Sequence, residues 1–130
     1  MRESYLETYS PPIPVVHIHI SSPDEEQWEG SFIAIIDTGA DFTIIPRRIL
    51  ASVKAVQIGS GVLSTQWKDR RSVNIYEVDL RIGEITLSYI EVAGDTSSDE
   101  LILGRNVLNE LDLRLDGPNH QLYLLSNNLQ

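Results

Sequence analysis

Apolar and polar residues alternate along several short runs of the chain, which is the period of a strand with one buried face. Residues 78–82 and 85–87 alternate strictly on either side of Gly83 and Glu84, and this arrangement predicts a short hairpin. The same reasoning predicts further strands at residues 15–20, 28–36 and 89–92.

Two segments with strand character, residues 55–63 and 72–80, flank a polar stretch that contains glycine. This pattern predicts a long, exposed β-hairpin. Apolar residues on one helical face predict one or two helical turns over residues 106–111. The remaining expected elements are a turn or short helical segment at 47–53 and strands at 111–115 and 121–125. The chain is therefore predicted to be all-β with one short C-terminal helix.

The length of 130 residues fits one domain with a modest core. Residues 1–14 end in the proline-rich run Ser10–Pro14, so we expect an extended N-terminal arm without helix or ladder hydrogen bonds. Residues 15–130 are expected to form the single folded domain.

Composition excludes several classes of function. The net charge of −9 argues against a nucleic-acid partner, which would need a basic surface. No apolar stretch is long enough to span a bilayer, and the charged N-terminus lacks the apolar segment of a signal peptide, so no membrane partner and a cytoplasmic location are expected. Zero cysteines exclude disulfides, thiolate nucleophiles and cysteine zinc sites.

Histidine residues also give no metal site. His17 and His19 share one strand face, but a third ligand of the right type is missing, because His120 belongs to a distant turn. We therefore expect structural or solvent-facing histidines, and we expect neither a metal nor a cofactor.

The candidate chemistry begins where the apolar run of residues 32–36 delivers Asp37 into the small-residue turn Thr38-Gly39-Ala40. A carboxylate placed where a buried apolar strand meets a loop has a pKa that burial and neighbouring groups can shift, and this suits acid/base chemistry. Thr38 supplies a hydroxyl, and Gly39 lets the backbone approach Asp37 closely. Taken alone, without the flanking pattern, Asp37 is better interpreted as a turn aspartate that accepts hydrogen bonds from its own backbone.

The surrounding residues resemble the active-site motif of the aspartic proteases, in particular the single-domain, retropepsin-like (retroviral-type) family. The run from Phe32 to Pro46 contains Asp-Thr-Gly between aliphatic segments, and Leu101–Leu108 is similar to the segment that opens the C-terminal helix of retropepsins. The likeness covers roughly residues 14–125. It implies a closed, barrel-like acid protease fold, in which the long hairpin is the flap.

The resemblance implies a homodimer that acts as an aspartic-type endopeptidase on extended peptides. Aspartic protease chemistry needs two carboxylates that share a proton, and the chain has one Asp-Thr-Gly. The nearest other match, Asp95-Thr96-Ser97, has serine in place of glycine. Each subunit would therefore supply one Asp37, with Thr38 and Gly39 completing the catalytic motif. The alternative is a non-catalytic dimerisation or peptide-binding module with the same fold.

Further site residues follow from the resemblance. Asp41 is expected to pair with Arg105, and Gly104 and Arg105 are expected to support the active-site region. Two roles are open to Trp67, which would either cap the substrate or pack on the neighbouring sheet. Ala40 lacks the hydroxyl of many acid-acting relatives, which predicts a mildly acidic optimum. The expected substrate-binding residues are Ala40, Asp41, Gly61, Val62, Leu63 and Trp67, and the expected aliphatic lining is Ile35, Ile44, Val62 and Leu63.

Overall fold

The computed structural model of the chain describes residues 1–64, 70–95 and 97–126. Strands dominate this part, and the helices are two short ones. In chain order the elements are β1 (Arg2–Ser4), β2 (Val15–Ser21), β3 (Glu29–Ile36), β4 (Ile44–Pro46), α1 (Arg47–Ser52), β5 (Val56–Ser64), β6 (Arg70–Ile82), β7 (Ile85–Asp95), β8 (Leu101–Leu103), α2 (Arg105–Leu108), β9 (Leu113–Asp116) and β10 (Gln121–Leu124).

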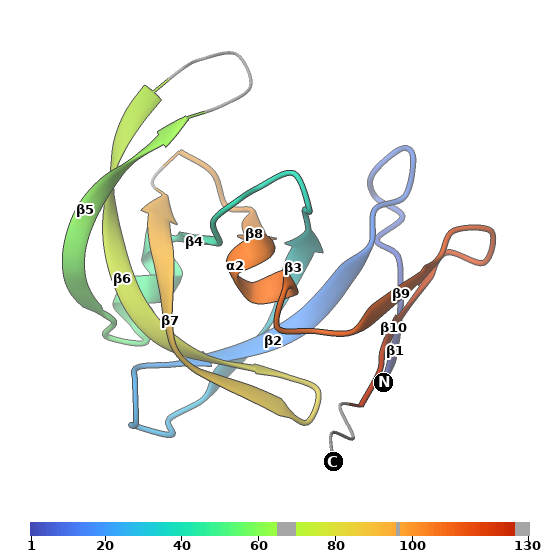
Figure 1. The fold of residues 1–130 in the computed structure, drawn as a ribbon, viewed down its shortest axis with the longest axis horizontal. Helices are drawn as coiled ribbons and strands as arrows, with labels where there is room; N and C mark the ends of the chain where they lie inside the picture. The colour runs from blue at the N-terminus through green and yellow to red at the C-terminus, as the bar shows by residue number, and fades with distance from the viewer. Residues whose placement is uncertain (65–69, 96, 127–130) are drawn as a thin grey trace.

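Six strands close into a barrel in the order β2-β3-β8-β4-β7-β6, because β6 also pairs with β2. The all-β, barrel-like prediction is thereby confirmed. Two of the pairings are parallel, β3 with β8 and β4 with β7. The first of these sets the end of β3 beside β8, although the two strands are far apart in sequence (Figure 1).

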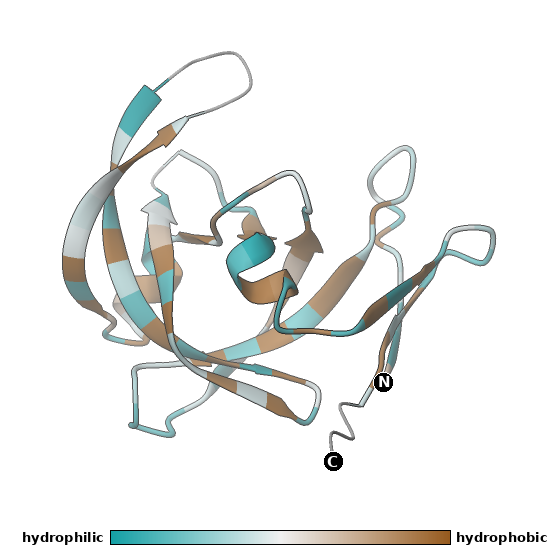
Figure 2. Cartoon of the chain, in the orientation of Figure 1, coloured by the Kyte–Doolittle hydropathy of each residue, from teal (hydrophilic) through white to brown (hydrophobic). Residues whose placement is uncertain are grey.

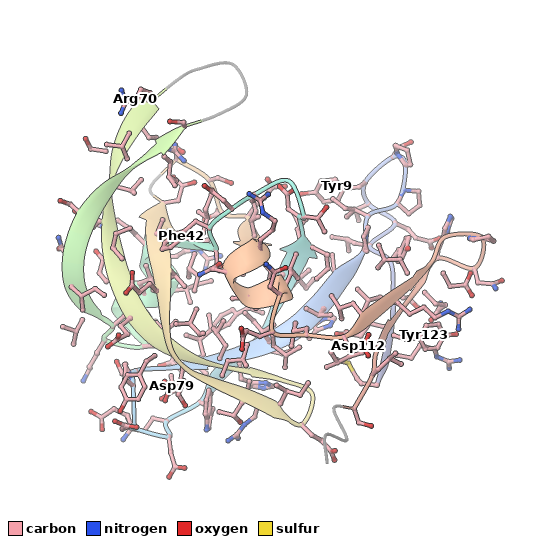
Figure 3. The ribbon with its side chains drawn as sticks, viewed as in Figure 1. Tyr9, Phe42, Arg70, Asp79, Asp112 and Tyr123 are labelled. Atoms are coloured by element: carbon pink, nitrogen blue, oxygen red, sulfur yellow. The ribbon has the colours of Figure 1, made fainter. Side chains whose placement is uncertain are left out.

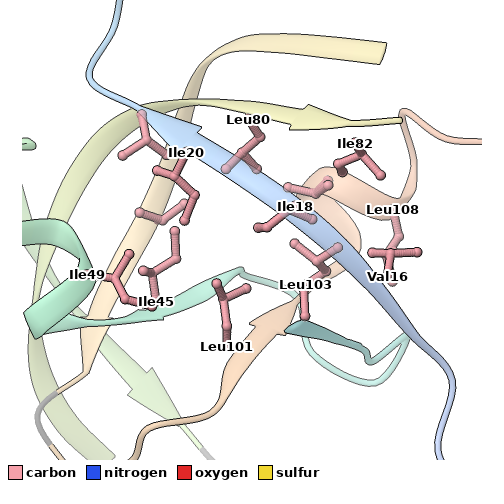
Figure 4. Close-up of a cluster of buried hydrophobic side chains, with 14 of the residues drawn as sticks. Val16, Ile18, Ile20, Ile45, Ile49, Leu80, Ile82, Leu101, Leu103 and Leu108 are labelled. Carbon is pink, nitrogen blue, oxygen red and sulfur yellow. The ribbon is translucent and has the colours of Figure 1, made fainter. Parts of the chain in front are cut away.

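Alternate residues of the strands fill the barrel. Val16, Ile18 and Ile20 of β2 are fully buried, whereas His17 between them is exposed. Figure 2 shows the corresponding alternation of apolar and polar residues along β2 and β6. The buried faces of β2, β6, β8 and α1 meet in one cluster (Figure 4). Burial of this apolar surface is the main stabilising contribution to the fold.

The predicted long hairpin is formed by β5 and β6, which pair from Val56–Glu77 to Ser64–Arg70. It arches away from the barrel in Figure 1. The predicted short hairpin is also present, since Ile82 pairs with Ile85 across the Gly83 turn. Residues 65–69, which include Trp67, lie outside the described part of the chain.

The expectation for the N-terminal arm was wrong in one respect. Residues Arg2–Ser4 form β1 and pair antiparallel with β10, and Leu6 makes an isolated bridge with Ile13. The prolines that suggested an unpaired arm all follow Ser10, so the N–H groups of residues 2–4 are free to enter a ladder. The result is a second, three-stranded sheet, β1-β10-β9, beside the barrel (Figure 1).

The helical predictions also needed adjustment. The segment after Pro46 is a true helix, α1, so the described part of the chain contains two short helices rather than one. α2 begins at Arg105 and ends at Leu108, and Leu111 follows in a turn that packs against the core. Neither helix in the described residues has the length and apolar character that crossing a membrane requires.

Candidate active site

Asp37 follows the last residue of β3 and begins a tight turn. Its backbone N–H donates a hydrogen bond of 3.1 Å to the carbonyl of Leu103 at the end of β8. The N–H of Ala40 donates to the carbonyl of Asp37 at 3.2 Å and closes the turn. The parallel pairing of two buried strands therefore fixes where this carboxylate enters the surface loop.

The Asp37 carboxylate is oriented by its own turn. The N–H of Gly39 donates a hydrogen bond of 2.9 Å to Asp37 Oδ1. A Cβ atom on residue 39 would lie 3.2 Å from the same oxygen, which is tighter than most real contacts. The predicted reason for glycine at this position is thus present in the structure. Asp37 is partly buried, while Thr38 and Gly39 are exposed.

Arg105 holds the other side of the turn. Its backbone N–H donates to the Ala40 carbonyl at 2.8 Å, and its guanidinium Nη1 donates to the Thr38 carbonyl at 2.8 Å. The expected ion pair with Asp41 is absent from the described residues. The Thr38 carbonyl accepts from the guanidinium instead, because a tight turn leaves this carbonyl without a partner in a ladder. Arg105 supports the loop as expected, but through backbone groups.

Thr43 and Asn106 complete this support, and the sequence pattern did not assign them a role. The N–H and the hydroxyl of Thr43 both donate to Asn106 Oδ1, at 3.0 and 2.8 Å. The Thr43 oxygen in turn accepts the N–H of Gly104 at 3.0 Å. The available signal in the sequence was a threonine inside the aliphatic run that follows the Asp-Thr-Gly motif. Thr43 is fully buried in the structure, and a buried hydroxyl needs a hydrogen-bond partner.

Gly104 allows this close approach. A Cβ atom on residue 104 would lie only 2.5 Å from the backbone carbonyl carbon of Phe42. The segment of residues 103–106 and the loop of residues 37–43 are therefore packed backbone to backbone. Together these two segments form the floor of the site and position the Asp37 turn.

Between this floor and the β5–β6 hairpin lies a pocket of about 380 Å³. A second pocket of about 260 Å³ continues along the hairpin. Of the expected substrate-binding residues, Ala40, Asp41 and Leu63 line the first pocket, and Gly61 and Val62 line the second. Ile44 also contributes to the lining, whereas Ile35 is buried and lines neither pocket. Trp67 is outside the described residues.

An ion pair connects the β5–β6 hairpin to the end of β7. Arg71 of β6 lines the first pocket, and its Nη2 lies 3.3 Å from the buried Asp95 carboxylate at the end of β7. Its Nη1 donates to the Ser97 hydroxyl at 2.6 Å. Burial alone would raise the pKa of Asp95, but hydrogen bonds from Ser97 and the charge of Arg71 outweigh it, and the pKa falls below its ordinary value.

No group of three histidine or acidic side chains in the described residues is arranged to hold a metal ion. His17 instead contacts Glu3. The Glu3 carboxylate accepts a hydrogen bond of 2.6 Å from the backbone N–H of His17 and also contacts its ring. His120 stacks on Tyr5.

The retroviral aspartyl protease family matches residues 10–116, which include the Asp37 turn, the hairpin and the 103–106 segment. The chain belongs to this family. No curated protein sequence matches the chain.

Solved structures of retropepsin-like proteins share the fold. A retropepsin-like aspartic protease from Rickettsia conorii is 12% identical with a TM-score of 0.62, over 95% of this chain and 88% of that one. EIAV protease, complexed with an inhibitor, is 15% identical with a TM-score of 0.56, over 75% and 86%. The retroviral protease-like domain of Ddi1 from Leishmania major is 15% identical with a TM-score of 0.51, over 89% and 98%. At these identities the likeness shows that the chain has the retropepsin fold.

Proposed function

We propose that this retropepsin-like chain is a homodimeric aspartic endopeptidase that activates water between two Asp37 carboxylates, one from each subunit. The observation that carries the proposal is the way in which the structure positions the Asp37 carboxylate. Its carboxylate is oriented by the Gly39 N–H at 2.9 Å and stands beside a pocket on a loop that is clamped by the 103–106 segment. A carboxylate that only closed a turn would need neither the contacts from the 103–106 segment nor an adjacent pocket.

The chemistry requires a partner subunit. Two carboxylates about 3 Å apart cannot both ionise, so one is ionised and deprotonates the water while the other is protonated and polarises the scissile carbonyl. The chain contains a single Asp-Thr-Gly, so the second carboxylate comes from another copy across a twofold axis. Activity should then follow a bell-shaped pH profile that belongs to the coupled pair.

The substrate is proposed to be an extended peptide. A strand laid between the active-site loop and the β5–β6 hairpin would be held by main-chain hydrogen bonds, and its side chains would enter the pockets alternately. Ile44, Leu63 and Val62 give these pockets an aliphatic lining. We therefore expect cleavage next to large apolar side chains.

The test is an untargeted peptide-library digestion read by mass spectrometry, with the wild type and an Asp37→Asn variant. The variant removes the shared proton but almost no volume, so hydrolysis should disappear while the unfolding transition and the sedimentation behaviour stay unchanged. Asp99→Asn is the matched control, because Asp99 is exposed and does not line the two pockets beside Asp37.

Two outcomes would contradict the proposal. Full hydrolysis by Asp37→Asn would exclude Asp37 as the catalytic group. A wild type that binds library peptides without cleaving them, at any pH tested, would favour a non-catalytic peptide-binding module. Specific activity should also fall on dilution as subunits separate.

A further inference from the structure

Another hollow in the surface lies apart from the two pockets beside Asp37. Its volume is about 570 Å³, which is typical of a small-molecule site. The helix α1 supplies part of its lining, and β6, the end of β7 and residues 98–99 supply more. It shares no lining residue with the two pockets between the active-site loop and the β5–β6 hairpin. We call this hollow the α1 pocket.

Tyr76 of β6 places a free polar group in the α1 pocket. The residue is only 9% exposed, and it lines the pocket. Its hydroxyl has no hydrogen-bond partner among the described residues, where every fully buried side-chain oxygen does have one. The hydroxyl is therefore accessible, and the pocket is where it is accessible. Since a tyrosine buried to this extent usually has a partner, the structure leaves one donor available to a ligand.

Gly94 of β7 brings Arg47 next to this tyrosine. A Cβ atom on residue 94 would lie 2.7 Å from Tyr76 Cε1, 3.2 Å from Leu50 Cδ1 and 3.3 Å from Arg47 Cγ. Three side chains from β6 and α1 thus meet over the bare backbone of β7. The Cε1 atom belongs to the same end of the ring as the hydroxyl. The aliphatic stem of Arg47 and the hydroxyl of Tyr76 are therefore at the same end of the pocket.

The charged groups of the lining leave one positive charge uncompensated. The carboxylate of Asp95 is paired with Arg71, and that of Asp99 is paired with Arg48 at 3.1 Å. Arg47 is exposed and forms no ion pair with another described residue. A ligand in the pocket therefore meets one net positive charge beside one free hydroxyl.

We propose that the α1 pocket binds a small organic carboxylate with an apolar body. The carboxylate accepts a bidentate hydrogen bond from the Arg47 guanidinium and a further hydrogen bond from the Tyr76 hydroxyl. The apolar body packs on the apolar side chains of the lining, which are Pro46, Leu50, Ala51 and Ala55.

The charge balance favours a carboxylate over other polar groups. A phosphate monoester carries close to two negative charges at neutral pH, and the Asp95 and Asp99 carboxylates of the lining would repel the second one. An ammonium group would be repelled by Arg47. A single negative charge balances Arg47 and adds no further repulsion.

The α1 pocket and the peptide pockets are connected by one ion pair. Asp95 lines the α1 pocket, and its partner Arg71 lines the pocket under the β5–β6 hairpin. Figure 3 shows Arg70, the residue before Arg71, at the start of β6. A ligand in the α1 pocket therefore lies beside the ion pair and leaves the peptide pockets open. This binding site does not depend on the proposed protease chemistry.

Phenylacetate is a suitable probe, and phenylacetamide is its uncharged isostere. Amide NMR spectra of the full chain are recorded as each compound is added. Phenylacetate should shift the backbone signals of Ala51 and Ser98 in a saturable way, whereas those of Gly39 and Gly61 in the peptide pockets should stay in place. Phenylacetamide should bind roughly fivefold more weakly or worse, because it lacks the charge. Phenyl phosphate should also bind more weakly than phenylacetate.

Two substitutions test the proposed donors separately. Tyr76→Phe removes only the hydroxyl, and Arg47→Gln removes the charge while it keeps part of the stem. Each variant should bind phenylacetate roughly fivefold more weakly or worse. Because the Tyr76 hydroxyl has no partner among the described residues, Tyr76→Phe should keep the wild-type unfolding midpoint. The loss of binding is then not a folding defect.

A tyrosine and an arginine of the second sheet provide matched controls. Tyr123, labelled on β10 in Figure 3, lies under the guanidinium of Arg114, with 5.2 Å between the guanidinium carbon and the ring centroid. Tyr123→Phe and Arg114→Gln remove the same groups as the test variants but at residues outside the α1 pocket. Both controls should bind phenylacetate as the wild type does.

Three results would overturn the proposal. The first is a wild type in which phenylacetate leaves the Ala51 and Ser98 signals in place. The second is equal affinity for phenylacetate and phenylacetamide. The third is wild-type affinity for phenylacetate in both Tyr76→Phe and Arg47→Gln. Peptide hydrolysis enters none of these measurements, so the binding site and the proposed function succeed or fail separately.

Discussion

The buried hydroxyl of Thr43 donates a hydrogen bond of 2.8 Å to Asn106 Oδ1 and accepts the N–H of Gly104 at 3.0 Å. Asn106 also donates from its amide nitrogen to the Glu91 carbonyl at 2.9 Å. One side-chain pair therefore connects the active-site loop, the start of α2 and β7. The position of the Asp37 turn depends on these contacts rather than on the turn alone.

Replacing Thr43 with valine should destabilise the protein although the shape is kept. The Gly104 N–H loses its acceptor in a buried place, and an unsatisfied buried polar group costs about 1–3 kcal/mol. Urea unfolding would measure the change. Thr86→Val is the matched control, because Thr86 is exposed and its hydroxyl only accepts a 3.3 Å contact from Arg81. Equal stability of the two variants would contradict a structural role for the Thr43 hydroxyl.

Gly104→Ala should be poorly tolerated. The added methyl group would lie 2.5 Å from the backbone of Phe42, so the loop or α2 has to move. Overpacking of this kind costs about 1–3 kcal/mol, and the displaced loop should also lower hydrolysis by shifting Asp37. The control is Gly59→Ala, where the new Cβ meets nothing within 4 Å. Thermal unfolding and peptide cleavage are measured on both variants, and a Gly104→Ala variant as stable and active as the control would show that the two backbones are not in close contact.

The pair of Arg71 and Asp95 should make stability depend on pH. The pKa of Asp95 lies below its ordinary value of 3.8, so the ionised carboxylate is favoured in the folded state. Its stabilising contribution is then fully present above the unfolded-state pKa and is lost as the pH falls through the folded-state pKa. The wild type should exceed Asp95→Asn in stability at pH 7, and the difference should shrink below about pH 4.

Urea unfolding at neutral and acidic pH would check this prediction. Asp99→Asn is the matched control, because its ion pair with Arg48 is exposed on both sides and such pairs contribute little. A stability difference between the wild type and Asp95→Asn that stays constant across the pH range would show that folding does not lower the pKa of Asp95.

The sequence predicted the parts of the fold that local pattern determines. The pattern of residues located four barrel strands, β2, β3, β6 and β7, but it missed the three-residue strands β4 and β8, which are too short to show a period. The apolar run before Asp37 correctly indicated a carboxylate at the end of a buried strand. The close contact between Gly39 and Asp37 was also foreseeable, because only glycine leaves room there.

The remaining features depend on contacts between distant segments. The guanidinium of Arg105 can reach either a carboxylate or turn carbonyls, and only the packed structure shows that it binds the Thr38 carbonyl. The pairing of β1 with β10 joins residues from opposite ends of the chain, and no local pattern in residues 2–4 distinguishes a free arm from an edge strand. The same holds for Thr43 and Asn106, whose partnership is long-range.

Removing residues 1–4 should destabilise the protein and expose the edge of β10. These residues include β1, whose register pairs Arg2, Glu3 and Ser4 with β10, and the N–H of Leu124 donates to the Met1 carbonyl at 2.8 Å. Loss of a few backbone hydrogen bonds, each contributing about 0.5–1.5 kcal/mol, should lower the unfolding free energy by roughly 1–3 kcal/mol. The bared strand would also become a new site for strand addition.

Thermal unfolding and sedimentation velocity would measure both effects. The deletion should lower the midpoint and should increase self-association, because the four-residue strand β10 then becomes the edge of the sheet in place of the three-residue β1. Arg2→Glu is the control, since it changes a side chain of β1 and keeps the backbone ladder. A truncated chain with the stability and sedimentation profile of the wild type would mean that β1 neither stabilises the sheet nor protects its edge.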